Sequence, residues 1–331
     1  MMGKVMTRDH GGNIDWAIDT YGGDPTDWID LSTGINREPY PLPNLSAEAW
    51  TALPTKAAMA GLKAVAAKAY GTQADILPLA GAQAAIQMLP RLRVGKTAKI
   101  LSPTYNEHGI CARAGGWSVQ EVATLDALKG ADLAIVVNPN NPDGQTHNPD
   151  NILALAGHVG TLVVDESFGD PRPDLSIAPY VGTIENLFVL RSFGKFYGLA
   201  GVRLGFLLGH PLALAQIAEL AGPWPVSGVA IETGVAALQD TEWGHQTITR
   251  LREDTARMDR LADAYGWTLV GGCELFRLYD TPSAKAAQDH LAKSHIWSRI
   301  FPWSDGLIRL GLPSLTEWSR VETALGTDNG I

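Results

Sequence analysis

The stretch "LRSFGKFYGLAGVRLG", residues 190–205, places two cations in a glycine-rich and mostly apolar part of the chain. Lys195 follows Ser192 by three positions and precedes Arg203 by eight, and glycines stand at 194, 198, 201 and 205. Surface lysines ordinarily have polar neighbours, and Lys195 does not. Because glycine lets the backbone approach a ligand closely, the stretch indicates a bound group that the two cations anchor.

Short apolar runs before and after this stretch predict a sheet that is covered on both faces. The runs are bounded by Pro, Gly or Asn and alternate with helical patterns such as 82–92 and 151–160. Continuous apolar strands of this kind suit a largely parallel sheet. We therefore expect a doubly wound α/β domain, with strands at "KILSP" (99–103), "LAIVVNP" (133–139), "TLVVDES" (161–167), "LFVLRS" (187–192) and "RLGFLLG" (203–209).

The character of the sequence changes after "AGPWPVSG" (221–228). One long helix is expected from Val229 to Tyr265, followed by short strands and by helices near 283–294 and 315–325. These elements predict a smaller α+β domain. The first 45 residues show little periodicity, and we expect them to wrap over a site rather than form core. The expected domains are an N-terminal segment 1–45 that packs on the small domain and on the site, a large domain 46–225 that holds the bound group, and a small C-terminal domain 226–331.

Composition narrows the possible partners. The chain has 331 residues, 45% hydrophobic and 18% charged, with a formal net charge of -9. This balance is typical of a globular protein and argues against nucleic acid or an anionic membrane as the main partner. No signal peptide, membrane span, CxxC pair or HxxxH motif is present, so we expect a cytoplasmic protein without a metal site. An anionic substrate would need a few well-placed cations.

Candidate functional residues follow the expected strands, where open α/β sheets form their ligand crevice. Tyr105 follows one strand, Asn141 lies in the tight turn "NPNNPDG" after another, and Asp165 ends a third. An unpaired carboxylate in such an apolar strand would be costly. In "LPLAGAQAAI" (77–86), a strand leads through a turn into a helix. The free N–H groups expected there form an anion cradle at Gly81, Ala82 and Gln83.

One ligand, pyridoxal phosphate, would satisfy all these groups. Lys195 would form the Schiff base, and Asp165 would pair with the pyridinium nitrogen. Tyr105 would stack on the ring, and Asn141 would donate to the ring hydroxyl oxygen. We expect the catalytic residues to be Lys195, Asp165 and Tyr105. The phosphate would be held by Gly81, Ala82, Gln83, Ser192 and Arg203.

Each residue alone has an ordinary structural interpretation. A loop lysine is usually solvated, and an aspartate at a strand end is usually a cap or turn former. The joint occurrence of these residues at successive strand ends favours the cofactor site instead. Ser192 and Lys195 also fit the S-x-x-K motif of penicillin-binding serine enzymes. The SDN and KTG triplets of those enzymes are absent, which makes a serine hydrolase a weak alternative.

With Ser at minus three and Arg at plus eight from Lys195, the chain resembles the fold type I superfamily of pyridoxal phosphate enzymes. This is the aspartate aminotransferase-like group, and the likeness is to its branch with histidinol-phosphate aminotransferases. It runs from "HGGN" (10–13) to "LIRLGLPSLTEWSRVETAL" (307–325). It implies a large domain with a mostly parallel seven-stranded sheet, a small α+β domain and a homodimer with its active site near the subunit boundary. It also implies that Arg309 binds a substrate α-carboxylate.

Within that branch, "HGGN", "DLSTGIN" (30–36) and "PWPVS" (223–227) are similar to decarboxylases of cobalamin biosynthesis. Those enzymes convert L-threonine O-3-phosphate to (R)-1-amino-2-propanol O-phosphate. The resemblance implies a small phosphorylated amino acid as substrate, with a His-Gly-Gly loop over its phosphate. Residues implied at the substrate are His10, Gly11, Gly12, Asn36, Asn141, Arg309 and, for an anionic group, Arg320.

Some positions depart from the wider superfamily. Phe168 stands where many relatives have a tyrosine, although the decarboxylase group often has Phe there too. "LPT" (53–55) replaces the Tyr-Pro-Asp whose tyrosine reaches the partner subunit, so that contact is expected to be absent or replaced. The main alternative is an aminotransferase acting on histidinol phosphate or another phosphorylated or aromatic amine. A remote alternative is a non-catalytic ligand-binding protein of the same fold.

Overall fold

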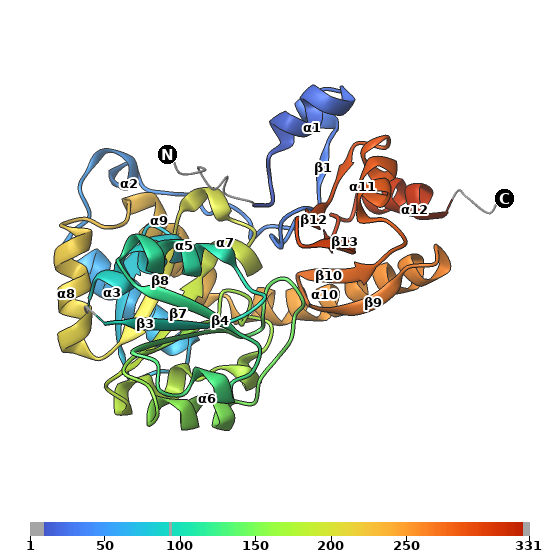
Figure 1. Ribbon diagram of the computed structural model, residues 1–331. Helices are drawn as coiled ribbons and strands as arrows, with labels where there is room; N and C mark the ends of the chain where they lie inside the picture. Colours follow the sequence, from blue (N-terminus) through green and yellow to red (C-terminus); the bar gives the residue numbers. More distant parts are fainter. Residues whose placement is uncertain (1–9, 93–94, 327–331) are drawn as a thin grey trace. The chain divides into compact units, whose positions relative to one another are not determined.

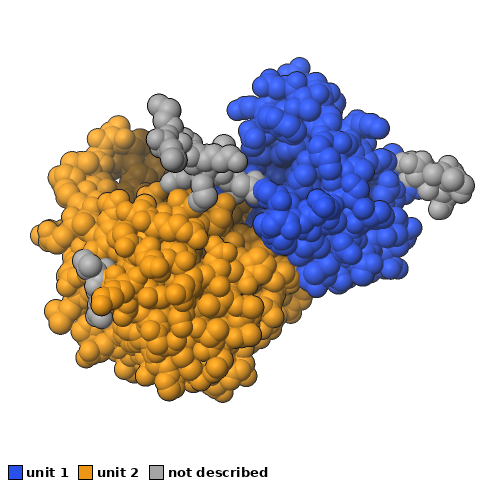
Figure 2. All heavy atoms as spheres, in the orientation of Figure 1, with its two compact units in different colours: residues 1–34, 253–271, 276–331 blue, residues 35–252, 272–275 orange. Residues whose placement is uncertain are grey.

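The computed structural model describes residues 10–92 and 95–326 (Figure 1). Two compact units divide the chain (Figure 2). Unit 1 comprises 1–34, 253–271 and 276–331, and unit 2 comprises 35–252 and 272–275. The division of the chain into 1–45, 46–225 and 226–331 includes residues outside the described ranges and stays a prediction.

A seven-stranded sheet forms the centre of unit 2, in the order β2-β8-β7-β6-β5-β3-β4. β8 runs antiparallel to both of its neighbours, and the remaining pairings are parallel. This confirms the expected mostly parallel sheet. Its strands are β2 (Asp75–Leu79), β3 (Thr97–Leu101), β4 (Ser118–Val122), β5 (Leu133–Val137), β6 (Leu162–Asp165), β7 (Leu187–Ser192) and β8 (Gly205–Gly209).

Helices bury both faces of this sheet. Every residue of β5 is buried, which explains why its sequence, LAIVV, is apolar without alternation. On one face of the sheet, Leu133 and Ile135 belong to a core cluster that includes side chains of α4, α5 and α8. The helices of unit 2 are α2 (Glu48–Thr51), α3 (Lys56–Ala69), α4 (Ala82–Met88), α5 (Asn106–Ala114), α6 (Pro149–Ala156), α7 (Phe193–Phe196), α8 (Pro211–Ala221) and α9 (Gly228–Gln239).

The prediction of a single long helix from Val229 to Tyr265 is wrong, because the helix is interrupted at Asp240. Asp240 has φ -84 and ψ 78, outside the helical region, and its Oδ1 accepts a hydrogen bond from Trp243 N at 3.0 Å. That contact caps the next helix, α10 (Thr241–Ala264). Helical patterns stand on both sides of Asp240, and the sequence-based prediction joined them into one helix. No helix in the described ranges is long and apolar enough to cross a membrane.

Unit 1 contains a small sheet with helices, as expected. Its strand order is β12-β13-β10-β9, and β13 runs antiparallel to β10 and β12. A separate pair joins β1 to β11 in parallel. The elements are α1 (Ile14–Tyr21), β1 (Ile29–Asp30), β9 (Thr268–Cys273), β10 (Phe276–Asp280), α11 (Ala284–Ala292), β11 (Ile296–Trp297), β12 (Arg299–Phe301), β13 (Ser304–Gly311) and α12 (Trp318–Gly326).

The N-terminal segment forms core, contrary to expectation. Ala17 of α1 and Trp28 are buried and pack with Ala292 and Trp297. The segment joins this core through one two-turn helix and one two-residue strand. Elements this short carry too little periodicity to be recognised from sequence.

Candidate active site

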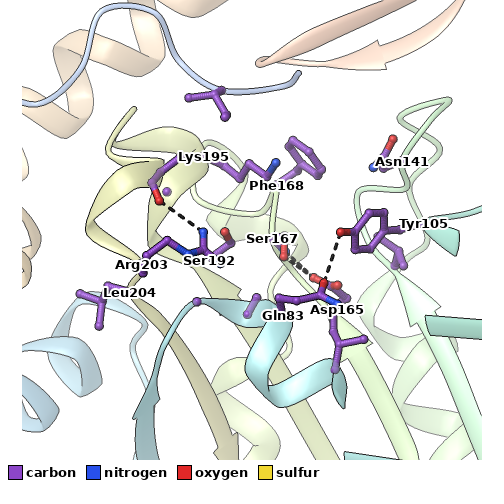
Figure 3. Close-up of a pocket in the computed structure, with 17 residues that line it drawn as sticks. Gln83, Tyr105, Asn141, Asp165, Ser167, Phe168, Ser192, Lys195, Arg203 and Leu204 are labelled. Carbon is purple, nitrogen blue, oxygen red and sulfur yellow. Dashed lines mark hydrogen bonds between the residues drawn. The ribbon is translucent and has the colours of Figure 1, made fainter. Parts of the chain in front are cut away.

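A cavity of about 220 Å³ lies in unit 2 where strands of the central sheet end (Figure 3). Asp165 ends β6 and Ser192 ends β7. The parallel register pairs Asp165 with Val137 of β5 on one side and with Leu190 of β7 on the other. All the residues predicted to hold the cofactor line this cavity: Gly81, Ala82, Gln83, Tyr105, Asn141, Asp165, Ser192, Lys195 and Arg203.

Glycines make room at the part of the cavity where Arg203 meets the start of α4. Gly81 has φ +78, and a Cβ there would lie 2.9 Å from Arg203 Nη2. A Cβ on Gly205 would lie 2.3 Å from Ala82 N. Only glycine fits at these contacts. The Arg203 guanidinium thus lies close to the backbone at the start of α4, and a guanidinium suits a phosphate. The free N–H expected at Gly81 is wrong, because Gly81 N donates to Leu79 O at 2.7 Å.

Asp165 is a buried carboxylate with several hydrogen-bond donors. Ser167 N and Ser167 Oγ donate to its Oδ1 at 2.9 and 2.5 Å. His108 Nε2 lies 2.9 Å from its Oδ2, and because an ionised carboxylate only accepts, the ring nitrogen donates. Burial alone would raise the pKa of Asp165, but these hydrogen bonds outweigh it and hold the pKa below its ordinary value. The carboxylate is therefore anionic in the fold.

Neither donor to Asp165 was among the residues predicted from the sequence. His108 lies in the first turn of α5, three residues after Tyr105. Nothing in the sequence around His108 marks it as a partner of Asp165, which is 57 positions away in the chain. Ser167 is two residues beyond Asp165, and its bonds back to the carboxylate form a local turn that sequence could have indicated.

Lys195 extends across the cavity toward Phe168 (Figure 3). Its Nζ lies 5.5 Å from the centroid of the Phe168 ring, and this ring is 4% exposed. The aromatic face attracts the ammonium and brings no hydroxyl into the cavity. Phe168 thus helps to define where the lysine amine lies.

Asn36 contacts the lysine-bearing segment from outside the cavity lining. Its backbone N donates to Lys195 O at 3.0 Å, and its Nδ2 donates to Phe196 O at 2.9 Å. Its Oδ1 accepts from Arg250 Nη2 at 2.7 Å. These bonds support α7, and the substrate-binding role of Asn36 stays a prediction.

The turn that carries Asn141 is fastened to the loop that carries Tyr105. Asn140 Nδ2 donates to Pro103 O at 2.9 Å, and Thr104 Oγ1 donates to Asn140 Oδ1 at 2.6 Å. Asn140 is 8% exposed. It is a further residue that sequence analysis did not single out, and it links two edges of the cavity.

The remaining predicted residues lie in unit 1: His10, Gly11, Gly12, Arg309 and Arg320. Gly12 N donates to Ser32 Oγ at 2.6 Å, and a Cβ on Gly11 would lie 2.4 Å from Ser32 O. Arg309 is buried, and its Nη2 donates to Ser32 O at 2.7 Å. The His-Gly-Gly segment and Arg309 therefore meet at Ser32.

A second cavity, of about 250 Å³, lies wholly within unit 1. His10 and Gly12 line it together with Ser298 and Arg299. Arg299 Nη1 donates to His10 O at 3.0 Å. The buried Ser298 Oγ has no hydrogen-bond partner among the described residues. Donors of this kind suit an anion.

Arg320 does not line this second cavity. Its guanidinium donates to Asp27 O, and its role toward an anionic group stays a prediction. No group of His, Cys, Asp and Glu in the part of the chain that the structure describes could hold a metal ion.

The model of the family "Aminotransferase class I and II" matches residues 26–330. The chain belongs to this family. Two curated relatives, each 42% identical, are named threonine-phosphate decarboxylase. The protein from Sinorhizobium sp. is matched over 92% of both chains. The protein from Pseudomonas aeruginosa is matched over 96% of this chain and 97% of its own.

A solved structure shows the same fold. Histidinol-phosphate aminotransferase from Sinorhizobium meliloti, in complex with pyridoxal-5'-phosphate, superposes with a TM-score of 0.79. It is 20% identical, and the match covers 94% of this chain and 92% of that one. At that identity the likeness concerns the fold.

The residues of the first cavity fit pyridoxal phosphate on chemical grounds. Arg203 beside the start of α4 suits its phosphate. An anionic Asp165 suits a protonated ring nitrogen. Lys195 supplies the amine that binds its aldehyde. Each of these groups lines the same cavity.

Proposed function

We propose that this chain is a pyridoxal phosphate-dependent decarboxylase of L-threonine O-3-phosphate, producing CO2 and (R)-1-amino-2-propanol O-phosphate for cobalamin biosynthesis. The observation that carries the proposal is the single cavity that joins Lys195 to an anionic Asp165. The choice of substrate is supported by the two relatives named threonine-phosphate decarboxylase, which match at 42% identity over more than nine-tenths of their lengths.

Each side chain of the cavity has a stated task in this proposal. Lys195 carries the cofactor and returns a proton to the substrate Cα after the carboxylate leaves as CO2. Asp165 keeps the proton on the ring nitrogen, Tyr105 covers the ring and Asn141 donates to its hydroxyl oxygen. The cofactor, when bound, supplies an electron sink for the pair released at Cα. The phosphate of the cofactor is held by Gly81, Ala82, Gln83, Ser192 and Arg203.

The resemblance assigns residues to the two anionic groups of the substrate. Arg309 binds the carboxylate, and His10, Gly11 and Gly12 bind the phosphate, with Arg320 as a further candidate. The cavity beside His10 supports this, because Arg299 and Ser298 bring additional donors to it. Binding energy from the remote phosphate would fix which Cα bond is broken.

We also propose that the chain is a cytoplasmic homodimer. Large apolar side chains are exposed in and beside α2, where Leu42 is 78%, Trp50 70% and Leu53 64% exposed. A contiguous exposed apolar patch marks a protein contact, and we propose that these side chains form one. Light scattering on the purified chain should give twice the monomer mass, and replacing Trp50 and Leu53 by Ser should reduce it.

The function is tested by mixing the purified chain with pyridoxal phosphate and threonine phosphate. Released CO2 and 2-oxo acid are measured separately. We expect CO2 without oxo acid, and a loss of at least about 10³-fold in kcat for Lys195→Ala. Lys63→Ala, at a surface ion pair with Asp75, is the matched control. Transamination of histidinol phosphate, with no CO2 from threonine phosphate, would establish the aminotransferase alternative instead.

A further inference from the structure

Glu107 is a buried acid beside the first cavity, and the proposed mechanism does not use it. It is 1% exposed and lies in the first turn of α5. It does not line the cavity. The helix N-terminus favours a negative charge there, but a buried carboxylate still needs hydrogen-bond donors. The donors of Glu107 therefore indicate its task.

The principal donor comes from a residue that does line the cavity. Gln83 Nε2 donates to Glu107 Oε2 at 2.6 Å. On the other side of the same amide, Tyr105 OH donates to Gln83 Oε1 at 3.3 Å. One helical turn further along α5, Cys111 Sγ lies 3.9 Å from Glu107 Oε2. The three residues Glu107, Gln83 and Tyr105 form a chain of hydrogen bonds that ends at the cavity.

The carboxylate sets the direction of this chain. A carboxylate only accepts, whereas an amide has a donating end and an accepting end. Glu107 therefore fixes Nε2 of Gln83 on its own side, and Oε1 must face Tyr105. The Tyr105 hydroxyl then donates a hydrogen bond to Gln83 Oε1. We propose that Glu107 is a positioning residue that, through Gln83, holds the Tyr105 ring in place at the cofactor site.

This inference rests on the proposed function where it concerns the cofactor. Glu107→Gln keeps the shape of the side chain but removes the requirement for a donor, because its own amide both donates and accepts. The Gln83 amide can then turn over, and Tyr105 loses its acceptor in that orientation. Glu107→Asp keeps the charge and with it the direction of the chain.

The first experiment needs no cofactor. Urea unfolding is measured for Glu107→Gln, Tyr105→Phe and the double variant, first with Gln83 present and then in a Gln83→Leu background. We expect the two substitutions to be coupled by about fivefold in the unfolding equilibrium constant when Gln83 is present. The coupling should vanish in the Gln83→Leu background. Additive effects with Gln83 present, or coupling that survives Gln83→Leu, would overturn the proposal.

The second experiment measures the dissociation constant of pyridoxal phosphate by absorbance. We expect it to rise about tenfold in Glu107→Gln, to stay closer to the native value in Glu107→Asp, and to be unchanged in Glu121→Gln, an exposed acid on β4. Equal affinities for the native chain and Glu107→Gln would contradict positioning at the cofactor site. If the native chain binds no pyridoxal phosphate, the proposed function fails, and the unfolding cycle still decides the role of Glu107.

Discussion

His108 Nε2 lies 2.9 Å from Asp165 Oδ2, and both residues are 2% exposed. The histidine comes from the first turn of α5, and the aspartate ends β6. A buried carboxylate in an apolar sheet would ordinarily take up a proton. Hydrogen bonds from His108 and Ser167 lower the pKa of Asp165 instead, so they hold an anionic carboxylate at the edge of the cavity.

Removing the imidazole should weaken the cofactor site. In His108→Leu, Asp165 loses a donor that keeps it anionic, and we expect pyridoxal phosphate affinity and kcat for CO2 release to fall about tenfold each. Absorbance titration and the CO2 assay measure the two quantities. His158→Gln, at an exposed histidine, serves as the control. An unchanged kcat in His108→Leu would show that the hydrogen bonds from Ser167 are enough to keep Asp165 anionic.

The low pKa of Asp165 predicts a pH-dependent share of stability. Because the pKa of Asp165 is lower in the fold than its ordinary value of 3.8, the ionised Asp165 stabilises the fold above that value. The contribution is lost as pH falls through the folded pKa. The free energy of unfolding in urea, compared between the native chain and Asp165→Asn, should therefore differ most above pH of about 5. The difference should shrink as the pH falls below 3.8 and through the lower pKa of the folded state. A difference that is constant with pH would contradict the assignment.

Two glycine substitutions should have opposite effects on stability. Gly81→Ala forces a side chain into φ +78 with a Cβ 2.9 Å from Arg203 Nη2, and we expect a cost of about 1–3 kcal/mol. Gly61 lies inside α3 with nothing within 4 Å of its Cβ position. Gly61→Ala should stabilise the fold by about 0.5–1 kcal/mol. Urea denaturation measures the free energy of unfolding of both variants. Weaker pyridoxal phosphate binding is expected for Gly81→Ala alone.

Arg203 should act on the phosphate of the cofactor and not on its ring. We expect the native chain to bind pyridoxal phosphate far more tightly than pyridoxal, which lacks the phosphate. In Arg203→Gln, affinity for pyridoxal phosphate should fall by about 10- to 100-fold, because a charged hydrogen bond contributes about 1.5–3 kcal/mol. Affinity for pyridoxal should change little. An equal loss for both compounds would place Arg203 elsewhere in the site. Arg113→Gln, at a surface ion pair with Glu121, is the control.

The cofactor cavity could be anticipated because its residues follow strands. Each strand is a local apolar run, and parallel strands bring their carboxyl ends to one edge. The positions of Tyr105, Asp165 and Lys195 relative to those runs were therefore enough to predict that they line one cavity. The same local signals did not reveal the break at Asp240, where a side-chain cap begins a new helix.

The supporting residues could not be anticipated in this way. Glu107 and His108 are adjacent polar residues in a helix, and nothing in their immediate sequence says that both are buried. Their partners, Gln83 and Asp165, are 24 and 57 positions away in the chain. Only the packing of α4 and α5 on the sheet brings these groups into contact.

The sequence by itself determined the main apolar strands of the central sheet, the residues at the ends of those strands and the kind of cofactor they suit. These follow from local apolar patterns and from motif spacing around Lys195. The tertiary structure alone decided the charge of Asp165 and the direction of the Glu107–Gln83–Tyr105 chain. Charge and hydrogen-bond direction depend on burial and on donors from distant segments, and those conditions exist only once the chain is folded.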